Sequence, residues 1–153
     1  MPEDRTFLMG KFAAVLPGSL RYARNHMWAR PHGDGHRFGL TAYAIRLMQD
    51  VYFLDWQVSP GDAVELLHPI GHIETSKAVS DLFAPVAGTI MVFNPPLLAD
   101  PSGINVDGYG DGWLFEMTCA SDKLMTVDEY HQFLADNWEK TQRLIKGKIN
   151  TEE

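Results

Sequence analysis

Lys77 is the residue whose type and surroundings most clearly indicate chemistry in this chain. It lies in the stretch Ile73–Ala78, where a short turn separates two extended runs. An attachment lysine must expose its ε-amine to a modifying enzyme while its backbone stays fixed. The tip of a tight hairpin meets both demands, because strand pairing on either side anchors the turn. A lysine at such a tip would be accessible for covalent attachment of a prosthetic group.

Small and acidic residues surround this lysine. Ser76 is expected beside Lys77 at the centre of the turn, Ala78 follows, and Glu74 and Asp81 flank it. Ionised carboxylates at these two positions could guide a modifying enzyme. The alternative is an ordinary solvated lysine, which is what most lysines are. Schiff-base chemistry needs a desolvated pocket or a cationic neighbour, and the residues around position 77 provide neither.

Two other patterns match metal sites only in outline. The segment Asn105–Glu116 has the length of a calcium loop, with Gly110 at the sixth place. It lacks the flanking helix pair that such a loop requires, so a solvated turn is the better interpretation. His68 and His72 have a proline and a glycine between them, and on a strand they would lie about 13 Å apart. We predict no metal site.

Cys119 is the only cysteine, so no intramolecular disulfide can form, as is usual in a reducing compartment. It could exchange with a disulfide, but free cysteines are usually buried, and we favour an idle thiol.

The apolar segment Phe7–Leu20 is interrupted by a lysine, a proline and a glycine. A secretory signal or a membrane span of roughly 20 apolar residues would be uninterrupted. We therefore expect a cytoplasmic protein without a membrane span.

The composition indicates one globular domain. The chain has 153 residues, of which 45% are hydrophobic and 22% charged, which is enough for a core without disulfides or a structural metal. The net charge of -7 argues against a nucleic-acid partner, because phosphates are bound by clustered Lys and Arg. It instead fits partners with basic patches, where complementary charge mainly raises the association rate.

Short extended runs separated by turn residues dominate the middle of the chain. The turn at Ser59–Asp62 is typical, because its proline presets φ and its glycine accepts a left-handed conformation. Residues Asn94–Gly112 should be largely loop. Many short strands with frequent turns are typical of a sandwich or barrel. The predicted strands are Arg21–Arg30, His36–Leu40, a buried strand Val51–Trp56, Ala63–His68, Ile70–Thr75, Ala78–Phe83, Thr89–Phe93 and Trp113–Thr118.

Three helical segments are predicted. Thr41 should N-cap a short helix that runs through Met48, and a further short helix is expected around Leu8–Val15. Thr126–Glu129 forms a capping box, and apolar residues at helical spacing predict a helix over about 127–146. We expect its apolar stripe to pack on the β core, with a partner surface as the alternative.

A family resemblance covers most of the chain, from about Tyr22 to Met117. Each of its residues is weak evidence alone, but together and in this order they resemble the glycine cleavage H-protein family, among the lipoyl and biotinyl carriers. They are Tyr22, His26, Trp28, Gly39–Thr41, Tyr43, Ala44, Asp50, Val51, Phe53, Gly61, Asp62, Gly71, Ile73–Ala78, Ser80, Asp81, Ala84–Val86, Gly88, Asn94 and Tyr109–Leu114.

The resemblance implies a mainly β fold, a lipoyl-domain-like barrel-sandwich hybrid with a short internal helix and a long C-terminal helix. It implies lipoate as a covalent cofactor, in amide linkage to Lys77. Biotin carriers have methionines where Ser76 and Ala78 stand, which favours lipoate. The chain would then comprise an N-terminal extension (1–20), a lipoyl carrier domain (21–125) and a C-terminal helix packed on that domain (126–149).

One motif departs from the family. The family usually has His-Glu-Trp where this chain has His26, Met27 and Trp28. The resemblance implies a cleft in which the loaded arm rests, formed by Asn25, His26, Met27 and Trp28. In the family the glutamate would pair with the amine of an aminomethyl cargo, which contributes up to about 1 kcal/mol when exposed and more when desolvated. Met27 offers a thioether and no charge, while Asp81 keeps a second acidic position.

This departure and the extra terminal segments favour a carrier of sulfur-bound intermediates. Such a chain would resemble the lipoate-binding proteins of the heterodisulfide-reductase-like sulfur oxidation pathway more than an aminomethyl carrier of glycine cleavage. Either way we expect a non-catalytic carrier, since no acid–base or nucleophile set converges on Lys77. The implied partners are a lipoate-attaching ligase or transferase and dihydrolipoyl dehydrogenase-like or heterodisulfide-reductase-like enzymes. A third hypothesis is an unmodified scaffold module that kept the fold, against which the intact Glu74 and Lys77 argue.

Overall fold

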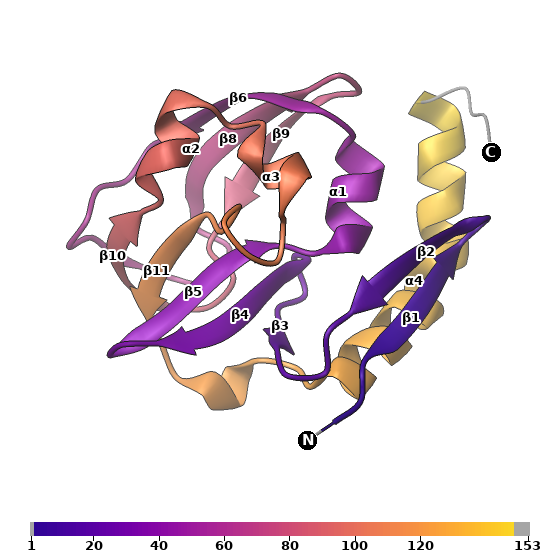
Figure 1. Cartoon of the computed structure of the whole chain (residues 1–153), viewed down its shortest axis with the longest axis horizontal. Helices are drawn as coiled ribbons and strands as arrows, with labels where there is room; N and C mark the ends of the chain where they lie inside the picture. Colours follow the sequence, from indigo (N-terminus) through magenta and orange to yellow (C-terminus); the bar gives the residue numbers. More distant parts are fainter. Residues whose placement is uncertain (1, 149–153) are drawn as a thin grey trace.

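Two antiparallel β-sheets and an N-terminal β-hairpin make up most of the molecule (Figure 1). The structure, a computed structural model, describes residues 2–148 and the side chains of residues 2–144. The larger sheet has the strand order β3-β4-β5-β11-β10-β7, and the smaller has the order β6-β8-β9. The strands are β1 (Arg5–Met9), β2 (Phe12–Leu16), β3 (Arg21–Tyr22), β4 (Met27–His32), β5 (Gly35–Leu40), β6 (Val51–Trp56), β7 (Ala63–Val64), β8 (Pro69–Thr75), β9 (Val79–Phe83), β10 (Gly88–Phe93) and β11 (Phe115–Thr118).

The helices are shorter elements, except for the last one. They are α1 (Ala42–Met48), α2 (Pro95–Ala99), α3 (Gly103–Val106), the 3-10 turn η1 (Ser121–Lys123) and α4 (Val127–Lys148). The expectation of a mainly β fold with a short internal helix and a long C-terminal helix is confirmed. Residue 149, the end of the predicted C-terminal segment, lies outside the described residues.

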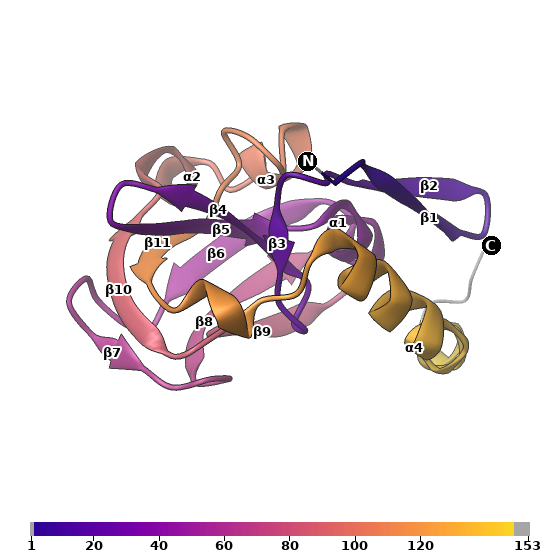
Figure 2. The same ribbon diagram turned by 90° about the horizontal axis from the view of Figure 1, so that it is seen from below.

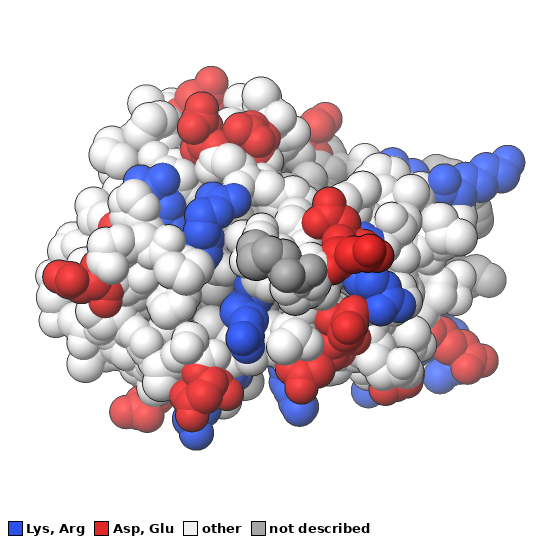
Figure 3. All heavy atoms as spheres, turned by 60° about the horizontal axis from the view of Figure 1, so that its bottom comes forward, with Lys and Arg blue, Asp and Glu red and all other residues white. Residues whose placement is uncertain are grey.

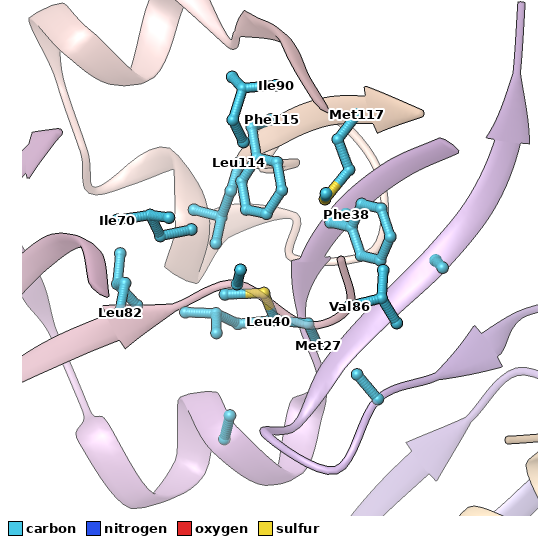
Figure 4. Packing of buried hydrophobic residues seen from close by; sticks show 14 of the residues in the cluster. Met27, Phe38, Leu40, Ile70, Leu82, Val86, Ile90, Leu114, Phe115 and Met117 are labelled. Atoms are coloured by element: carbon cyan, nitrogen blue, oxygen red, sulfur yellow. The ribbon is translucent and has the colours of Figure 1, made fainter. Parts of the chain in front are cut away.

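The main core lies between the two sheets. Phe38 of β5 and Phe115 of β11 lie near each other in Figure 4, Ile70 of β8 lies on the other side of Leu114, and none of the three is exposed to solvent. The rings of Phe38 and Phe115 stack with centroids 5.4 Å apart. Burial of a side chain of this size contributes about 1.5–3 kcal/mol. This core therefore fixes both sheets, including the one that carries Lys77.

A second buried group holds the N-terminal hairpin against α4, at one side of the sheets (Figures 1 and 2). The ring of Tyr130 stacks on Tyr22 with centroids 4.6 Å apart, and Phe7 meets Trp138 edge to face at 5.5 Å. We call this group the Tyr130 cluster. Its buried members are Phe7, Met9, Ala14, Leu16, Leu20, Tyr22, Trp28, Tyr43, Trp113, Val127, Tyr130 and Leu134.

The Tyr130 cluster refines the expected packing of the C-terminal helix. Leu134 and Tyr130 are buried, so the apolar stripe of α4 does face inward. It packs in a cluster shared with β1, β3 and α1 and not on the main core. Tyr22 also exchanges backbone hydrogen bonds with Met125 at 2.9 and 2.7 Å. The proposed boundaries at 20/21 and 125/126 stay a prediction, and side chains pack across both.

Both predicted helix caps are confirmed. The hydroxyl of Thr41 accepts the N–H of Ala44 at 3.2 Å at the start of α1. At the start of α4, Thr126 accepts the N–H of Glu129 at 3.2 Å, and the Glu129 carboxylate accepts the N–H of Thr126 at 2.8 Å. Such caps satisfy amides that have no partner within the helix.

The predicted helix around Leu8–Val15 is wrong, because this segment forms the β1–β2 hairpin. Phe7 and Met9 are buried while Leu8 is 63% exposed, which is the alternation of a strand and not of a helix. Gly10 has φ +66° in the turn, a conformation that glycine adopts at little cost. The run of apolar residues in this segment fits both the period of a strand and that of a helix, so the sequence alone did not decide between the two.

Four other predicted segments need correction. The segment Arg21–Arg30 is broken by a turn after Tyr22, so that β3 and β4 are separate strands. The strand at Val51–Trp56 is present but not buried, since Tyr52 is 62% exposed. The strand predicted at Ala63–His68 ends at Val64, and the loop at Asn94–Gly112 contains the short helices α2 and α3.

Acidic and basic side chains alternate over the face shown in Figure 3, and the basic ones do not gather into one surface there. Within residues 2–148, no helix combines the length and the apolar composition that crossing a membrane requires.

Candidate functional site

Lys77 lies at the tip of the hairpin that β8 and β9 form, beside the end of α1 (Figure 1). We call residues Thr75–Ala78 the Lys77 turn. The N–H of Thr75 donates to the carbonyl of Ala78 at 2.8 Å and closes it. Ser76, Lys77 and Ala78 are all exposed. The predicted position of the amine at an exposed hairpin tip is therefore what the structure shows.

Thr75 organises the turn from the inside, a role that the sequence analysis missed. Its hydroxyl accepts the N–H groups of Lys77 and Ala78, both at 3.1 Å, and lies 3.2 Å from the Ala78 carbonyl, to which it donates. The side chain is only 4% exposed. Threonine hydroxyls commonly bind backbone amides two or three residues further on, so a threonine two positions before the lysine was the available signal.

A further hydrogen bond ties the turn to the rest of the molecule. The N–H of Ser76 donates to the carbonyl of Asp50 at 2.9 Å. Asp50 lies between α1 and β6, so the tip is anchored on a segment distant in sequence. Asp50 belonged to the residues that carry the resemblance, but nothing in its type pointed to this contact.

The acidic residues flanking Lys77 lie on one face of the small sheet. Asp81 pairs with His72 across β8 and β9, and His72 and Glu74 are two apart on β8, so all three share a face. The Glu74 carboxylate is 3.6 Å from Nε2 of His72, while Asp81 is exposed. Two carboxylates next to the tip would attract a basic partner and raise its rate of encounter.

The Lys77 turn fits a covalently attached lipoyl group. Among the described residues, the ε-amine of Lys77 has no hydrogen-bond or ion-pair partner, so nothing must be broken before acylation. The turn holds the backbone of this lysine while its side chain reaches solvent. Amide formation would convert an exposed ammonium into a neutral group. This change would remove no buried ion pair or hydrogen bond.

The four residues of the predicted resting cleft differ in burial. Met27 and Trp28 are 1% and 0% exposed, so their side chains offer no open surface to an arm, and the cleft stays a prediction. Met27 packs in the main core beside Leu40 (Figure 4). Trp28 donates its indole N–H to the carbonyl of Gly108 at 2.8 Å. Burial of this kind depends on tertiary packing, which the local sequence does not reveal.

Asn25 contacts the β8–β9 hairpin that carries Lys77. Its Nδ2 donates to the carbonyl of Phe83 in β9 at 2.9 Å. Its Oδ1 is buried and has no hydrogen-bond partner within the described residues. A buried acceptor without a partner costs about 1–3 kcal/mol, so a donor brought there by a bound group would be stabilised.

His26 is half-buried and belongs to a hydrogen-bond network. Its Nδ1 lies 2.9 Å from the Tyr130 hydroxyl, which is in turn 3.0 Å from the hydroxyl of Thr41. Burial lowers the pKa of His26 to about 4 and raises that of Tyr130 well above its usual value. Both side chains are therefore neutral at physiological pH. The backbone of His26 has a φ of 70°, which is uncommon for a residue other than glycine.

A cavity of about 380 Å³ lies between α1, α3 and the N-terminal hairpin. Ile45, Asp50, Asn105 and Tyr109 contribute to its lining, and none of the four residues of the predicted cleft does. Through Asp50 this cavity adjoins the Lys77 turn.

The remaining candidates do not converge on Lys77. Cys119 is half-buried with its sulfur 3.6 Å from Nδ1 of His36, and burial raises the pKa of its thiol. This disfavours the reactive thiolate form. In the calcium-like segment, Asn105 bonds to backbone groups of Gln49 and Val51. Within the described part of the chain, no three His, Cys, Asp or Glu side chains are grouped so that they could hold a metal ion.

Comparison with known proteins gives one consistent result. A family model described as glycine cleavage H-protein matches residues 20–137. A probable glycine cleavage system H protein from Natronomonas pharaonis is 40% identical over 123 residues, which cover 78% of this chain and 97% of that protein. A glycine cleavage system H protein from Rubrobacter xylanophilus is 37% identical over 124 residues, covering 80% and 98%.

A solved structure shows the same similarity. The crystal structure of a glycine cleavage system H protein from Mycobacterium marinum aligns with a TM-score of 0.68 and 30% sequence identity. The alignment covers 80% of this chain and 99% of the other. The family model begins at residue 20 and ends at residue 137, so the β1–β2 hairpin and the last part of α4 lie outside it.

Proposed function

Because this chain belongs to the glycine cleavage H-protein family, whose members are non-catalytic carriers with lipoate bound to a lysine, we propose that Lys77 is the attachment residue. When bound, the lipoyl group supplies a dithiolane disulfide that can be reduced and can take up cargo. The chain itself holds the acceptor amine at a fixed, exposed place. Glu74 and Asp81 provide negative charge beside it for the partner that attaches the group.

The observation that carries this proposal is the exposed Lys77 turn, with its ε-amine free of any partner among the described residues. A lipoate-attaching ligase or transferase needs access to that nitrogen. The hydrogen bonds of Thr75 and the contact from Ser76 to Asp50 hold the backbone around it. Lys77 thus combines an exposed ε-amine with a backbone that hydrogen bonds of its neighbours hold in place.

A direct test is the intact mass of the protein after incubation with lipoate, ATP and a lipoate ligase. The wild-type chain should gain one lipoyl group and Lys77→Arg should gain none. Lys11 offers a matched control, because it also occupies an exposed hairpin tip, between β1 and β2. Lys11→Arg should be modified like the wild type. An unmodified wild type, or loss of modification in Lys11→Arg, would refute the assignment.

For the cargo, we propose an aminomethyl group exchanged between the enzymes of a glycine cleavage system. This is supported by the similarity to proteins named glycine cleavage system H protein. Dihydrolipoyl dehydrogenase-like enzymes would then reoxidise the arm. The test is transfer of labelled aminomethyl from glycine onto the lipoylated chain by a glycine-decarboxylating enzyme, read by mass.

A second candidate cargo is a sulfur-bound intermediate, as expected for partners of the heterodisulfide-reductase type. Met27 favours it, because a methionine stands where the resemblance places a glutamate; its side chain is buried, so the argument rests on the missing charge and not on a contact between the thioether and the arm. Without that carboxylate, a cationic cargo loses a partner, whereas a neutral sulfur species loses nothing. Failure of aminomethyl loading, together with uptake of sulfur from a persulfide donor, would select this candidate over the first.

A further inference from the structure

Asn105 of α3 bridges the corner between α1 and β6. Its Nδ2 donates to the carbonyl of Gln49 at 2.9 Å, and its Oδ1 accepts the N–H of Val51 at 2.9 Å. One side-chain amide, with donor and acceptor side by side, thus satisfies two backbone groups two residues apart. Gln49 has φ 67° and ψ -148° as the C-cap of α1, which is uncommon for a residue other than glycine. Asn105 therefore fixes a strained corner.

The peptide group between Asp50 and Val51 connects this corner to the Lys77 turn. A trans peptide group is planar, and its N–H and C=O point in opposite directions. On one side, the N–H of Val51 is held by Asn105. On the other side, the carbonyl of Asp50 accepts the N–H of Ser76 at 2.9 Å. Asn105 and Ser76 thus hold opposite sides of one rigid group.

Ser76 precedes Lys77 in the turn, so this contact acts directly on the direction of the tip. Ser76, Lys77 and Ala78 are exposed, and packing therefore cannot orient them. Thr75 holds the turn together from the inside, and it pairs with Val51 at the start of β6. The bond to the Asp50 carbonyl ties the tip to α1 and β6.

We propose that Asn105 is a positioning residue for Lys77. Through the Asp50–Val51 peptide group, it fixes the direction in which the Lys77 turn presents its amine to the attaching enzyme. This consequence rests on the proposed lipoylation of Lys77. Without Asn105 the tip samples several directions, and the affinity of the enzyme falls by the fraction of time spent in the competent one. The KM for the unmodified protein should then rise while kcat stays unchanged.

Asn105→Ala and Asn94→Ala form a matched pair for the test. Asn94 is also a structural asparagine, 4% exposed, and its Nδ2 donates to the carbonyls of Asp111 and Trp113 at 2.8 and 2.7 Å. None of these partners belongs to β6, β8 or β9. Both variants lose two backbone contacts, but only one of them loses contacts next to the Lys77 turn.

Two measurements separate positioning from general stability. Amide hydrogen exchange at Ser76, followed by NMR on unmodified protein, should accelerate about tenfold or more in Asn105→Ala and stay unchanged in Asn94→Ala, since one hydrogen bond is worth about one power of ten. The KM in the ligase reaction should rise about fivefold in Asn105→Ala only, on the same scale. If Asn105→Ala does not fold, Asn105→Asp keeps the acceptor for Val51 and should lie between it and the wild type.

The proposal is overturned if Ser76 exchanges at the wild-type rate in the Asn105 variants, or if Asn94→Ala shifts exchange and KM equally. The exchange experiment needs no lipoylation. A wild-type protein that the ligase ignores would therefore refute the proposed function while leaving the effect of Asn105 on Ser76 measurable.

Discussion

The Lys77 turn and the Tyr130 cluster are both ordered, but different forces order them. Three of the four residues of the turn are exposed, and hydrogen bonds from Thr75 and to Asp50 hold it. In the Tyr130 cluster the ring of Tyr130 is fully buried, stacks on Tyr22, and places its hydroxyl between His26 and Thr41. One region is held by directional bonds at the surface, the other by burial.

The difference follows from which side chains each region is able to bury. An acceptor lysine for a swinging arm must stay accessible, so packing cannot fix it and backbone hydrogen bonds do so instead. Each such bond contributes about 0.5–1.5 kcal/mol net. A buried aromatic ring contributes several times more through area and packing. Substitutions in the cluster should therefore change global stability, and substitutions at the turn should change local order.

The largest effect is expected for Tyr130→Ala. Loss of a fully buried ring leaves a cavity and removes the partner of His26 and Thr41, so the free energy of unfolding should fall by about 3–5 kcal/mol. Leu144→Ala, on the same helix but 63% exposed, should change it by less than about 0.5 kcal/mol. Urea unfolding measures both. A loss below about 1 kcal/mol in Tyr130→Ala would contradict the view that burial at this cluster stabilises the chain.

Acidification should weaken the same cluster through His26. Burial lowers the pKa of His26 to about 4, whereas in the unfolded chain it is near 6.5. The unfolded state therefore binds more protons between these values, and stability present above pH 6.5 is lost as the pH falls to about 4. The loss is up to about 3 kcal/mol.

His26→Asn provides the comparison for this pH dependence. Asparagine tolerates the positive φ at this position and does not titrate. Unfolding curves at several pH values should show a weaker decline between pH 6.5 and 4 in His26→Asn than in the wild type. Equal slopes would mean that His26 is not the group that titrates, and that the cluster is less closed than its geometry implies.

The sequence predicted the Lys77 turn better than the Tyr130 cluster, and the reason is physical. Strand pairing and turn chemistry act over a few neighbouring residues, so the hairpin around Lys77 follows from local pattern. The capping box at Thr126 is local in the same sense. Phe7, Tyr22 and Tyr130 meet across more than one hundred residues of chain, and no local period encodes such a meeting.

The strands of the N-terminal hairpin and the burial of Met27 were not foreseen for related reasons. Apolar residues at Phe7, Met9, Ala14 and Leu16 alternate along strands, but the run between them also fits a helix. Met27 was expected beside a cleft because of its place in a motif, and it lies in the core because β4 pairs there with β5. Asn105 was considered only as a metal ligand, since its contacts to Gln49 and Val51 depend on the fold.

Thr75→Val sharpens the comparison at the turn. Valine keeps the shape but removes the hydroxyl that accepts two amides, so the free energy of unfolding should fall by about 1–2 kcal/mol. Amide exchange at Lys77 and Ala78 should accelerate more than exchange elsewhere. Thr75→Ser retains the hydroxyl and should preserve the slow exchange. A uniform acceleration over the whole chain would mean that the turn is not held locally.

The smallest effect is expected for Arg5→Ala. Arg5 of β1 lies 2.7 Å from Asp128 in the first turn of α4, so this ion pair joins the hairpin and the helix that the Tyr130 cluster also joins. The two side chains are 44% and 69% exposed, and exposed pairs contribute about 0.2–1 kcal/mol because solvent and salt screen them. The loss should be under about 0.5 kcal/mol and should vanish in 1 M salt. A larger loss that persists at high salt would show that surface charge, and not burial in the cluster, holds the N-terminal hairpin to α4.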